Sequence, residues 1–145
     1  MLITEMKEVT DEITAAFQHL IPQLTKHSSP PDRVALVKMA VSPDTAIFLA
    51  WDPDENGEII GSAALAISHS PTGHHGWIED VVVEEKCRQR GIGRALTQAL
   101  LDKARALGLT RVYLTSRPSR VAANRLYQSM GFIQRETNVY RYTLD

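Results

Sequence analysis

Residues 81–96 read VVVEEKCRQRGIGRAL, and this stretch decides the fold. The three valines at its start are typical of a buried strand. Apolar residues then recur at the spacing of one helix face, at Ile92, Ala95, Leu96, Ala99, Leu100, Ala104 and Leu107. Gly108 is placed to end that helix in the left-handed conformation. We therefore predict a strand, a basic glycine loop and a long amphipathic helix.

The loop between strand and helix has the chemistry of an anion site. The first amides of a helix have no partner inside the helix, and they point outward with the positive end of its dipole. Gly91 and Gly93 carry no Cβ that would block a phosphate from the backbone. Arg88, Arg90 and Arg94 add charge-assisted hydrogen bonds. A phosphate, and most naturally a pyrophosphate, is the expected guest.

Two common glycine loops do not fit. The Walker loop requires Lys and then Ser or Thr after its second glycine, and Arg94-Ala95 stands there instead. The dinucleotide-binding fingerprint requires a third glycine, and Leu96 occupies that position. A plain helix start with a glycine turn and solvated arginines remains the alternative.

Outward from this stretch, the sequence predicts a mixed α/β protein. Sequence periodicity and turn residues indicate strands and helices on both sides of it. The expected strands are residues 1–6, 45–51, 59–68, 77–83 and 111–115, with one or two more in 133–144. The expected helices are residues 11–24, capped by Thr10 or Asp11, a short helix opening at Asp32, and one from Pro118-Ser119 to Gly131. Residues 52–57 and 70–76 are expected to be loops.

Bulk properties fit one ordinary globular domain over residues 1–145. The net charge of −1 gives no reason to expect a nucleic acid or a membrane as partner. The single cysteine excludes an internal disulfide and a zinc site on paired cysteines, so we expect no metal. The first residues lack the features of a signal peptide, and no apolar run reaches the roughly 20 residues that span a bilayer. These features predict a soluble cytoplasmic protein.

The pattern Arg88-x-x-Gly91-x-Gly93 resembles the Arg/Gln-x-x-Gly-x-Gly/Ala signature of the GNAT N-acetyltransferase superfamily. Residues 78–83 resemble that family's fourth strand, and residues 123–132, with Leu126-Tyr127 and Gly131-Phe132, resemble its late helix. The match is strong from Trp77 to Phe132. The resemblance implies a mixed sheet splayed between its fourth and fifth strands, with helices on both faces and acetyl-CoA as co-substrate in the opening.

The resemblance also implies contacts for the cofactor. The pantetheine arm is expected on the backbone of Val81 and Val83, and the pyrophosphate on the amides from Gln89 through Gly91, Ile92 and Gly93 to Arg94. Arg88 and Arg90 are expected to assist with their side chains, and Asn124 to face the cofactor. Many family members carry asparagine where this chain has Arg120, so that contact is not carried over. The family is often dimeric, so a homodimer is possible.

Two residues are candidates for the chemistry. Tyr127 is the candidate general acid for the departing thiolate, a role that the resemblance implies. Strand alternation places residues 77, 79, 81 and 83 on one side, so Glu79 is the candidate general base, facing the same side as Val81 and Val83. Asp80 should face the other way. A core tyrosine and a solvated carboxylate are the structural alternatives for the two residues.

The cysteine and the histidines are weaker candidates for catalysis or metal binding. Cys87 has no activating histidine nearby in the sequence, so a covalent acetyl-enzyme is not expected. His27, His74 and His75 are interpreted as polar loop residues, because adjacent histidines rarely converge on a metal. The leading prediction is transfer of an acetyl group to an amine of a small molecule or peptide. The alternatives are a longer acyl group, a hydroxyl acceptor, or a non-catalytic acyl-CoA-binding module.

Overall fold

The computed structural model covers residues 1–145 and describes residues 1–53 and 57–145. The chain forms two compact units, Met1–Leu114 and Thr115–Asp145. Residues 54–56, which belong to the expected loop 52–57, lie outside the described part.

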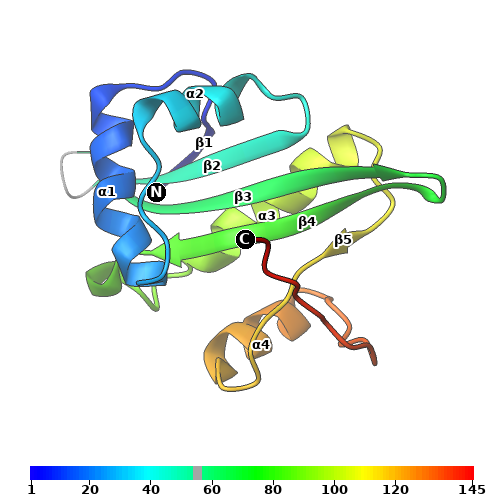
Figure 1. Ribbon diagram of the computed structural model, residues 1–145. Coiled ribbons are helices and arrows are strands. Elements are labelled where there is room, and N and C mark those ends of the chain that lie inside the picture. The colour runs from blue at the N-terminus through cyan, green and yellow to red at the C-terminus, as the bar shows by residue number, and fades with distance from the viewer. Residues whose placement is uncertain (54–56) are drawn as a thin grey trace. The chain divides into compact units, whose positions relative to one another are not determined.

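The first unit is built on a five-stranded sheet whose strands lie side by side in chain order (Figure 1). Strands β1 to β4 pair antiparallel, whereas β5 runs parallel to β4. The bounds are β1 Leu2–Glu5, β2 Thr45–Asp52, β3 Glu58–Ser70, β4 Gly73–Val83 and β5 Val112–Tyr113. The predicted mixed sheet is confirmed.

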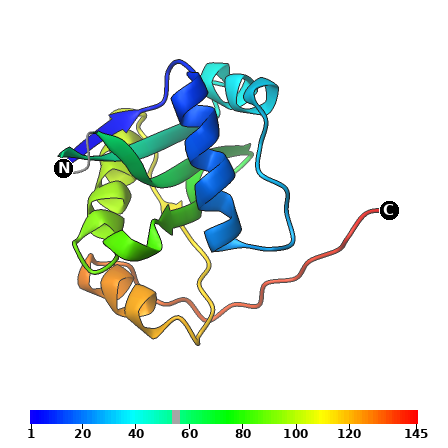
Figure 2. The same ribbon diagram turned by 90° about the vertical axis from the view of Figure 1, so that its left-hand side faces the viewer.

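Three α-helices cover this sheet on both faces. α1 (Asp11–Leu24) and α2 (Arg33–Val41) lie on one face, and α3 (Ile92–Ala106) lies on the other (Figures 1 and 2). The Thr10 hydroxyl accepts from the Ile13 amide at 3.1 Å, and the Asp32 carboxylate accepts from the Ala35 amide at 2.8 Å. These caps satisfy amides that a helix start leaves without partners, as the sequence predicted.

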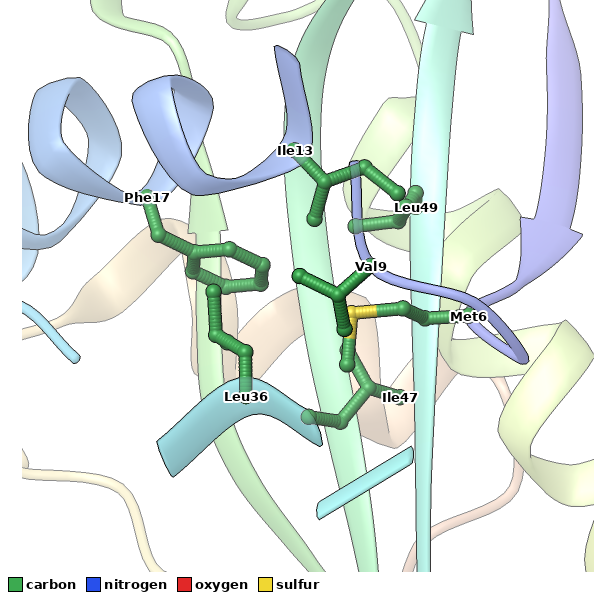
Figure 3. Packing of buried hydrophobic residues seen from close by; sticks show 7 residues of the cluster. All are labelled: Met6, Val9, Ile13, Phe17, Leu36, Ile47 and Leu49. Carbon is green, nitrogen blue, oxygen red and sulfur yellow. The ribbon is translucent and has the colours of Figure 1, made fainter. Parts of the chain in front are cut away.

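The core under α1 and α2 is apolar and close-packed. Figure 3 shows Phe17 and Ile13 of α1 pointing toward Leu36 of α2 and toward Ile47 and Leu49 of β2. Leu36 is fully buried, so its side chain joins the two helices to the sheet. Burying a side chain of this size stabilises the fold by about 1.5–3 kcal/mol.

The opposite face approaches α3 closely at Gly61 of β3. A Cβ at this position would lie 3.2 Å from Leu96 Cδ1 and 3.3 Å from Ile92 Cγ2. Both contacts belong to the first turns of α3. The missing side chain therefore lets the start of α3 pack directly on the sheet.

The predicted loop over residues 70–76 is much shorter in the structure. β3 extends to Ser70 and β4 begins at Gly73, so the strands form a hairpin joined by a tight turn at residues 71–72. Gly73 adopts a φ of 124°, and the Ser70 hydroxyl donates to its carbonyl at 3.2 Å. His74 and His75 are therefore strand residues that pair with His69 and Ser68, and their interpretation as loop residues was wrong.

The second unit contains α4 (Val121–Ser129). The helix begins later than Pro118-Ser119, and Gly131 follows it with a φ of 99°, in the predicted terminating role. The predicted strands in residues 133–144 are absent from the described structure. Alternation makes a strand only where a neighbour takes up the backbone groups, and this segment has no paired strand there. Its large apolar residues are mostly exposed: Ile133, Val139, Tyr140, Tyr142 and Leu144.

Among the helices of the described residues, none is both long and apolar enough to cross a bilayer.

Candidate functional site

The glycine loop curls so that its backbone amides can converge. Gln89 and Gly91 both have positive φ, at 65° and 80°, on either side of Arg90. Left-handed residues flanking another residue make a concave turn of N–H groups, which is a favourable site for an anion. A Cβ added to Gly91 would meet nothing within 4 Å, so its substituent-free side opens to space.

The start of α3 differs from the starts of α1 and α2. The first bond of the helix runs from the Ala95 amide to the Gly91 carbonyl at 3.0 Å. The amides of Ile92 and Gly93 precede that bond, at positions where a helix offers no carbonyl one turn back. Within the described residues, no side chain caps this helix, whereas Thr10 and Asp32 cap the other two. An anion there would meet backbone donors and the positive end of the helix dipole.

The arginine side chains of the loop point to different partners. Arg90 Nη1 lies 3.2 Å from Asp52 Oδ2 at the end of β2. Arg88 Nε donates to the Val83 carbonyl at 3.1 Å. The expectation that Arg88 and Arg90 assist a phosphate with their side chains stays a prediction. In this structure Arg90 pairs with the end of β2, and Arg88 is bonded to the end of β4.

The edge of β4 that faces β5 is open along most of its length. Gly76 and Trp77 pair with Val112 and Tyr113, and the Gly76 amide donates to the Arg111 carbonyl at 2.9 Å. From Ile78 to Val83, no strand pairs with that edge among the described residues. The sheet therefore opens between β4 and β5, as the resemblance implied.

Backbone direction shows what this open edge presents. The Glu84 amide donates to the Ile60 carbonyl of β3 at 2.8 Å. In a trans peptide the preceding carbonyl points the opposite way, so the Val83 carbonyl faces away from β3. It is the group that Arg88 contacts. An extended ligand on this edge would find strand-type donors and acceptors, with Val83 shared with Arg88.

A bulge in β4 overturns the alternation expected for this strand. Asp80 has a φ of 52°, and the pairing with β3 shifts between Ser62 and Ala64. Glu79 is opposite Ala64, whereas Val83 is opposite Gly61. Residues directly opposite each other share a face, and two strand residues three apart lie on different faces. The placement of Glu79 on the same side as Val81 and Val83 was therefore wrong.

The two faces can be assigned from their neighbours. Gly61, and with it Val83, faces α3 through Ile92 and Leu96. Ala64, and with it Glu79, lies on the face where α1 and α2 form the core cluster. The bulge adds a residue to β4 only. Residues of β4 before the bulge therefore lie on the opposite face from the one that simple alternation predicts.

The candidate base has an environment suited to proton transfer. Burial raises the pKa of the Glu79 carboxyl, and the adjacent negative charge of Asp80 raises that pKa further. The Glu79 side chain is nevertheless exposed to solvent. A carboxyl whose pKa is above its ordinary range is a stronger base when ionised.

Tyr127 and Asn124 lie in α4 of the second unit. Tyr127 is 8% exposed, and its ring meets Phe132 edge-on with centroids 5.7 Å apart. Burial raises the pKa of Tyr127, and the positive charge of Arg120 offsets part of that rise. The hydroxyl is therefore protonated at neutral pH. The Asn124 amide donates to the carbonyls of Arg117 and Arg120, both at 2.9 Å, so it serves the turn before α4.

Sequence reasoning missed two acidic residues beside the loop. Asp52 was assigned to a turn, but its side chain is 4% exposed and holds Arg90. Glu84, at the end of β4, accepts from His19 Nε2 at 2.7 Å and from Gln23 Nε2 at 2.6 Å. No local signal could have found these contacts, because the partners are far apart in the sequence. The one available hint for Asp52 was its place after an apolar strand.

The remaining candidates add no second site. Across the described residues, no group of three or more His, Cys, Asp and Glu side chains could hold a metal ion. Cys87 is buried in the short 3-10 turn Glu85–Cys87. Trp77 stacks on Tyr113 with ring centroids 5.0 Å apart. We assign neither residue a part in the chemistry.

Comparison with known proteins agrees with this geometry. Residues 8–132 match the model of the acetyltransferase (GNAT) family. A segment of 92 residues is 33% identical to a mycothiol acetyltransferase of Renibacterium salmoninarum, covering 61% of this chain and 27% of that protein. Another of 85 residues is 36% identical to the Escherichia coli [ribosomal protein bS18]-alanine N-acetyltransferase, covering 59% and 55%. The chain therefore matches only part of the length of these relatives.

The fold is also that of a solved relative. A structure of AAC(6')-Iy in complex with the bisubstrate analog CoA-S-monomethyl-acetylneamine superposes with a TM-score of 0.77 at 19% identity, over 100% of both chains. That likeness concerns the fold alone. The family match extends over both units and includes the glycine loop, the bulged strand and α4. The chain belongs to the acetyltransferase (GNAT) family.

Proposed function

We propose that this protein transfers an acetyl group from acetyl-CoA directly to a primary amine. The uncapped start of α3, with its concave basic loop, is the observation that carries the proposal. We further propose that the two units act as one domain, because the family match runs from residue 8 to residue 132 across both.

The chain offers a place for each part of the donor. The amides of residues 89–94 suit the pyrophosphate, since they lie at a helix start and in a positive-φ turn. The open edge of β4 suits the amides of a pantetheine arm, which would extend that edge in the manner of an added strand. The Val81 and Val83 backbone belongs to that edge. Arg88 would then share or release the Val83 carbonyl.

The register of β4 suggests how the two substrates are separated. A ligand along the strand edge is accessible from both faces of the sheet. Val83 faces the α3 side, and Glu79 faces the α1 and α2 side. We propose that the amine approaches from the Glu79 side and the donor phosphates lie on the α3 side. Direct transfer follows, because both substrates then meet at one edge.

The chemistry needs a neutral amine nucleophile. A lysine-type amine with a pKa near 10.4 costs about 4–5 kcal/mol to deprotonate at pH 7, and an α-amine costs about 1 kcal/mol. The amine nitrogen attacks the thioester carbonyl, the C–N bond forms and the C–S bond breaks. Glu79, directly or through water, takes the proton from nitrogen, and Tyr127 gives its proton to the leaving sulfur. The products are an amide and free CoA.

The relatives are named for different acceptors, so the acceptor amine of this protein belongs either to a small molecule or to a peptide. One relative is named for mycothiol, and another for the alanine of a ribosomal protein. Both classes present a primary amine to such a site. We propose a primary amine as the class of acceptor and place the protein in the cytoplasm, where acetyl-CoA is available.

The test is a screen of amines with acetyl-CoA and a thiol-detecting reagent. We expect release of free thiol that depends on one class of amine, with the acetylated amine identified by mass. Tyr127→Phe should then lower kcat at saturating acetyl-CoA, with little change in the binding of CoA. Donor binding without turnover of any amine would favour a non-catalytic module. Faster turnover with a longer acyl-CoA would contradict the acetyl preference.

A further inference from the structure

The Asp52–Arg90 ion pair joins the glycine loop to the end of β2. Asp52 is the last residue of β2, and Arg90 is at the centre of the loop. The carboxylate side chain is 4% exposed, whereas the arginine side chain is 51% exposed. A carboxylate removed from water in this way is costly unless it is paired. The pair therefore holds the loop to the sheet.

Backbone geometry shows why the anchor matters. Arg90 lies between two residues of positive φ, Gln89 and Gly91. This turn aims the amides of the loop to one side only while the chain keeps that conformation. Arg90 has a side chain that can stabilise this turn, because its guanidinium is engaged at 3.2 Å with Asp52. The ion pair thus fixes the residue between the two positive-φ residues to the end of β2.

A second ion pair ties α3 to the sheet at the other end of the helix. Lys103 Nζ lies 2.9 Å from Glu5 Oε1, and both side chains are largely buried, at 26% and 18% exposure. Glu5 belongs to β1, and Lys103 lies near the last turn of α3. The two pairs have similar chemistry, but one lies at the loop and the other is remote from it.

We infer that Asp52 is a positioning residue that orders the donor-binding loop through Arg90, and that the Arg90 guanidinium is an anchor rather than a phosphate ligand. The inference rests on the proposed function, since the loop is taken to bind the pyrophosphate of acetyl-CoA. Because the Asp52 side chain is only 4% exposed, we assign it no contact with either substrate. Its effect should appear in donor binding and leave the chemical step unchanged.

The two roles for Arg90 predict opposite results for Asp52→Asn. If Asp52 orders the loop, removing its charge should weaken acetyl-CoA binding about tenfold, equivalent to about 1.4 kcal/mol. If Arg90 instead binds phosphate, removing the competing carboxylate should leave binding unchanged or strengthen it. Glu5→Gln is the matched control, and it should leave the Kd for acetyl-CoA unchanged.

The experiment compares Kd for acetyl-CoA by calorimetry, and kcat and KM for acetyl-CoA and for S-acetylpantetheine, which lacks the pyrophosphate. We expect Asp52→Asn to raise KM for acetyl-CoA, to keep kcat, and to keep kcat/KM for S-acetylpantetheine. Arg90→Gln should act like Asp52→Asn, and the double variant should be no worse than either. A thermal melt of each variant shows whether it is folded. If Asp52→Asn does not fold, Arg90→Gln tests the same ion pair, because the Arg90 side chain is half-exposed.

Three outcomes overturn the inference. The first is that Asp52→Asn binds acetyl-CoA as tightly as the wild-type protein or more tightly. The second is that Asp52→Asn lowers kcat/KM equally for acetyl-CoA and S-acetylpantetheine. The third is that the losses of acetyl-CoA affinity in Asp52→Asn and Arg90→Gln add up in the double variant. Failure of the proposed function looks different, because the wild-type protein itself would then bind no acetyl-CoA. Wild-type binding with an unaffected Asp52→Asn variant refutes only the role of Asp52.

Discussion

Glu79 and Val83 lie on opposite faces of β4, although simple alternation puts them on the same face. The positive φ of Asp80 marks the bulge that separates them. The strand thus presents a carboxyl toward the α1 and α2 side and an apolar residue toward α3. This arrangement gives the two proposed substrates different approaches to one strand edge.

Removal of the candidate base should change the pH dependence of catalysis. Because burial and the charge of Asp80 raise the pKa of Glu79, its carboxylate form predominates only above that raised pKa. We expect kcat/KM to fall on the acid side at a higher pH than an unperturbed glutamate would give. Glu79→Gln should lower kcat/KM by about 10²- to 10⁴-fold for a lysine-type amine and remove this acid limb.

Asp80→Asn provides the matched control for this profile. Loss of the neighbouring negative charge should lower the pKa of Glu79, so the acid limb should move to lower pH while activity is retained. An acid limb that persists unchanged in Glu79→Gln would assign it to another group.

Gly91 should matter for the donor more than for the fold. It has a φ of 80°, and a Cβ added there would meet no atom within 4 Å, so Gly91→Ala should cost about 1–2 kcal/mol of backbone strain. The new methyl would stand where the loop opens to its ligand, and we expect a larger loss in acetyl-CoA affinity. Calorimetry and chemical denaturation measure the two effects separately.

Gly108→Ala is the control for Gly91→Ala. Gly108 follows the far end of α3 with a φ of 75° and is equally open, so its backbone cost should be similar. The Gly108→Ala variant should bind acetyl-CoA with the affinity of the wild-type protein. Equal affinity losses in the two variants would mean that the loop has no special role.

Glu84 should make the fold sensitive to acid. Burial by itself would raise the pKa of Glu84, but the hydrogen bond from Gln23, the charge and hydrogen bond of His19 and the charge of Lys86 together lower it. Its ionised form therefore stabilises the folded state above the unfolded pKa, near 4.5, and this stabilisation is lost as pH falls through the lowered folded pKa.

Glu84→Gln tests this dependence by urea denaturation over a range of pH. We expect the variant to be less stable by about 1.5 kcal/mol at neutral pH, which is typical of a hydrogen bond to a charged group. The difference should shrink at acidic pH as the wild-type carboxyl becomes protonated. A difference that is independent of pH would show that packing, and not the charge, is responsible.

The sequence predicted those elements whose signals are local. α1 occupies residues 11–24 as expected, because Thr10 caps its start and its apolar residues keep helical spacing up to Leu24. The loop and α3 were predicted for the same reason, since glycines and periodicity lie within one stretch. Local capping and spacing are physical constraints that a single sequence displays directly.

Features that depend on distant partners were not predictable. The bulge at Asp80 arises from pairing with β3, and no glycine marks it. The anchoring of Arg90 by Asp52 joins residues far apart in the chain. The alternating pattern of residues 133–144 suggested strands, but a strand also needs a neighbour, which the pattern cannot show.

Titration with acetyl-CoA, followed by thermal and chemical unfolding, tests the central claim most directly. Binding to the folded state alone stabilises a protein by about 2.7 kcal/mol at a ligand concentration of 100 times Kd. We predict this stabilisation for the wild-type protein with both acetyl-CoA and CoA, and a weaker response for Gly91→Ala. A folded wild-type protein whose unfolding is unchanged by either compound would contradict the account.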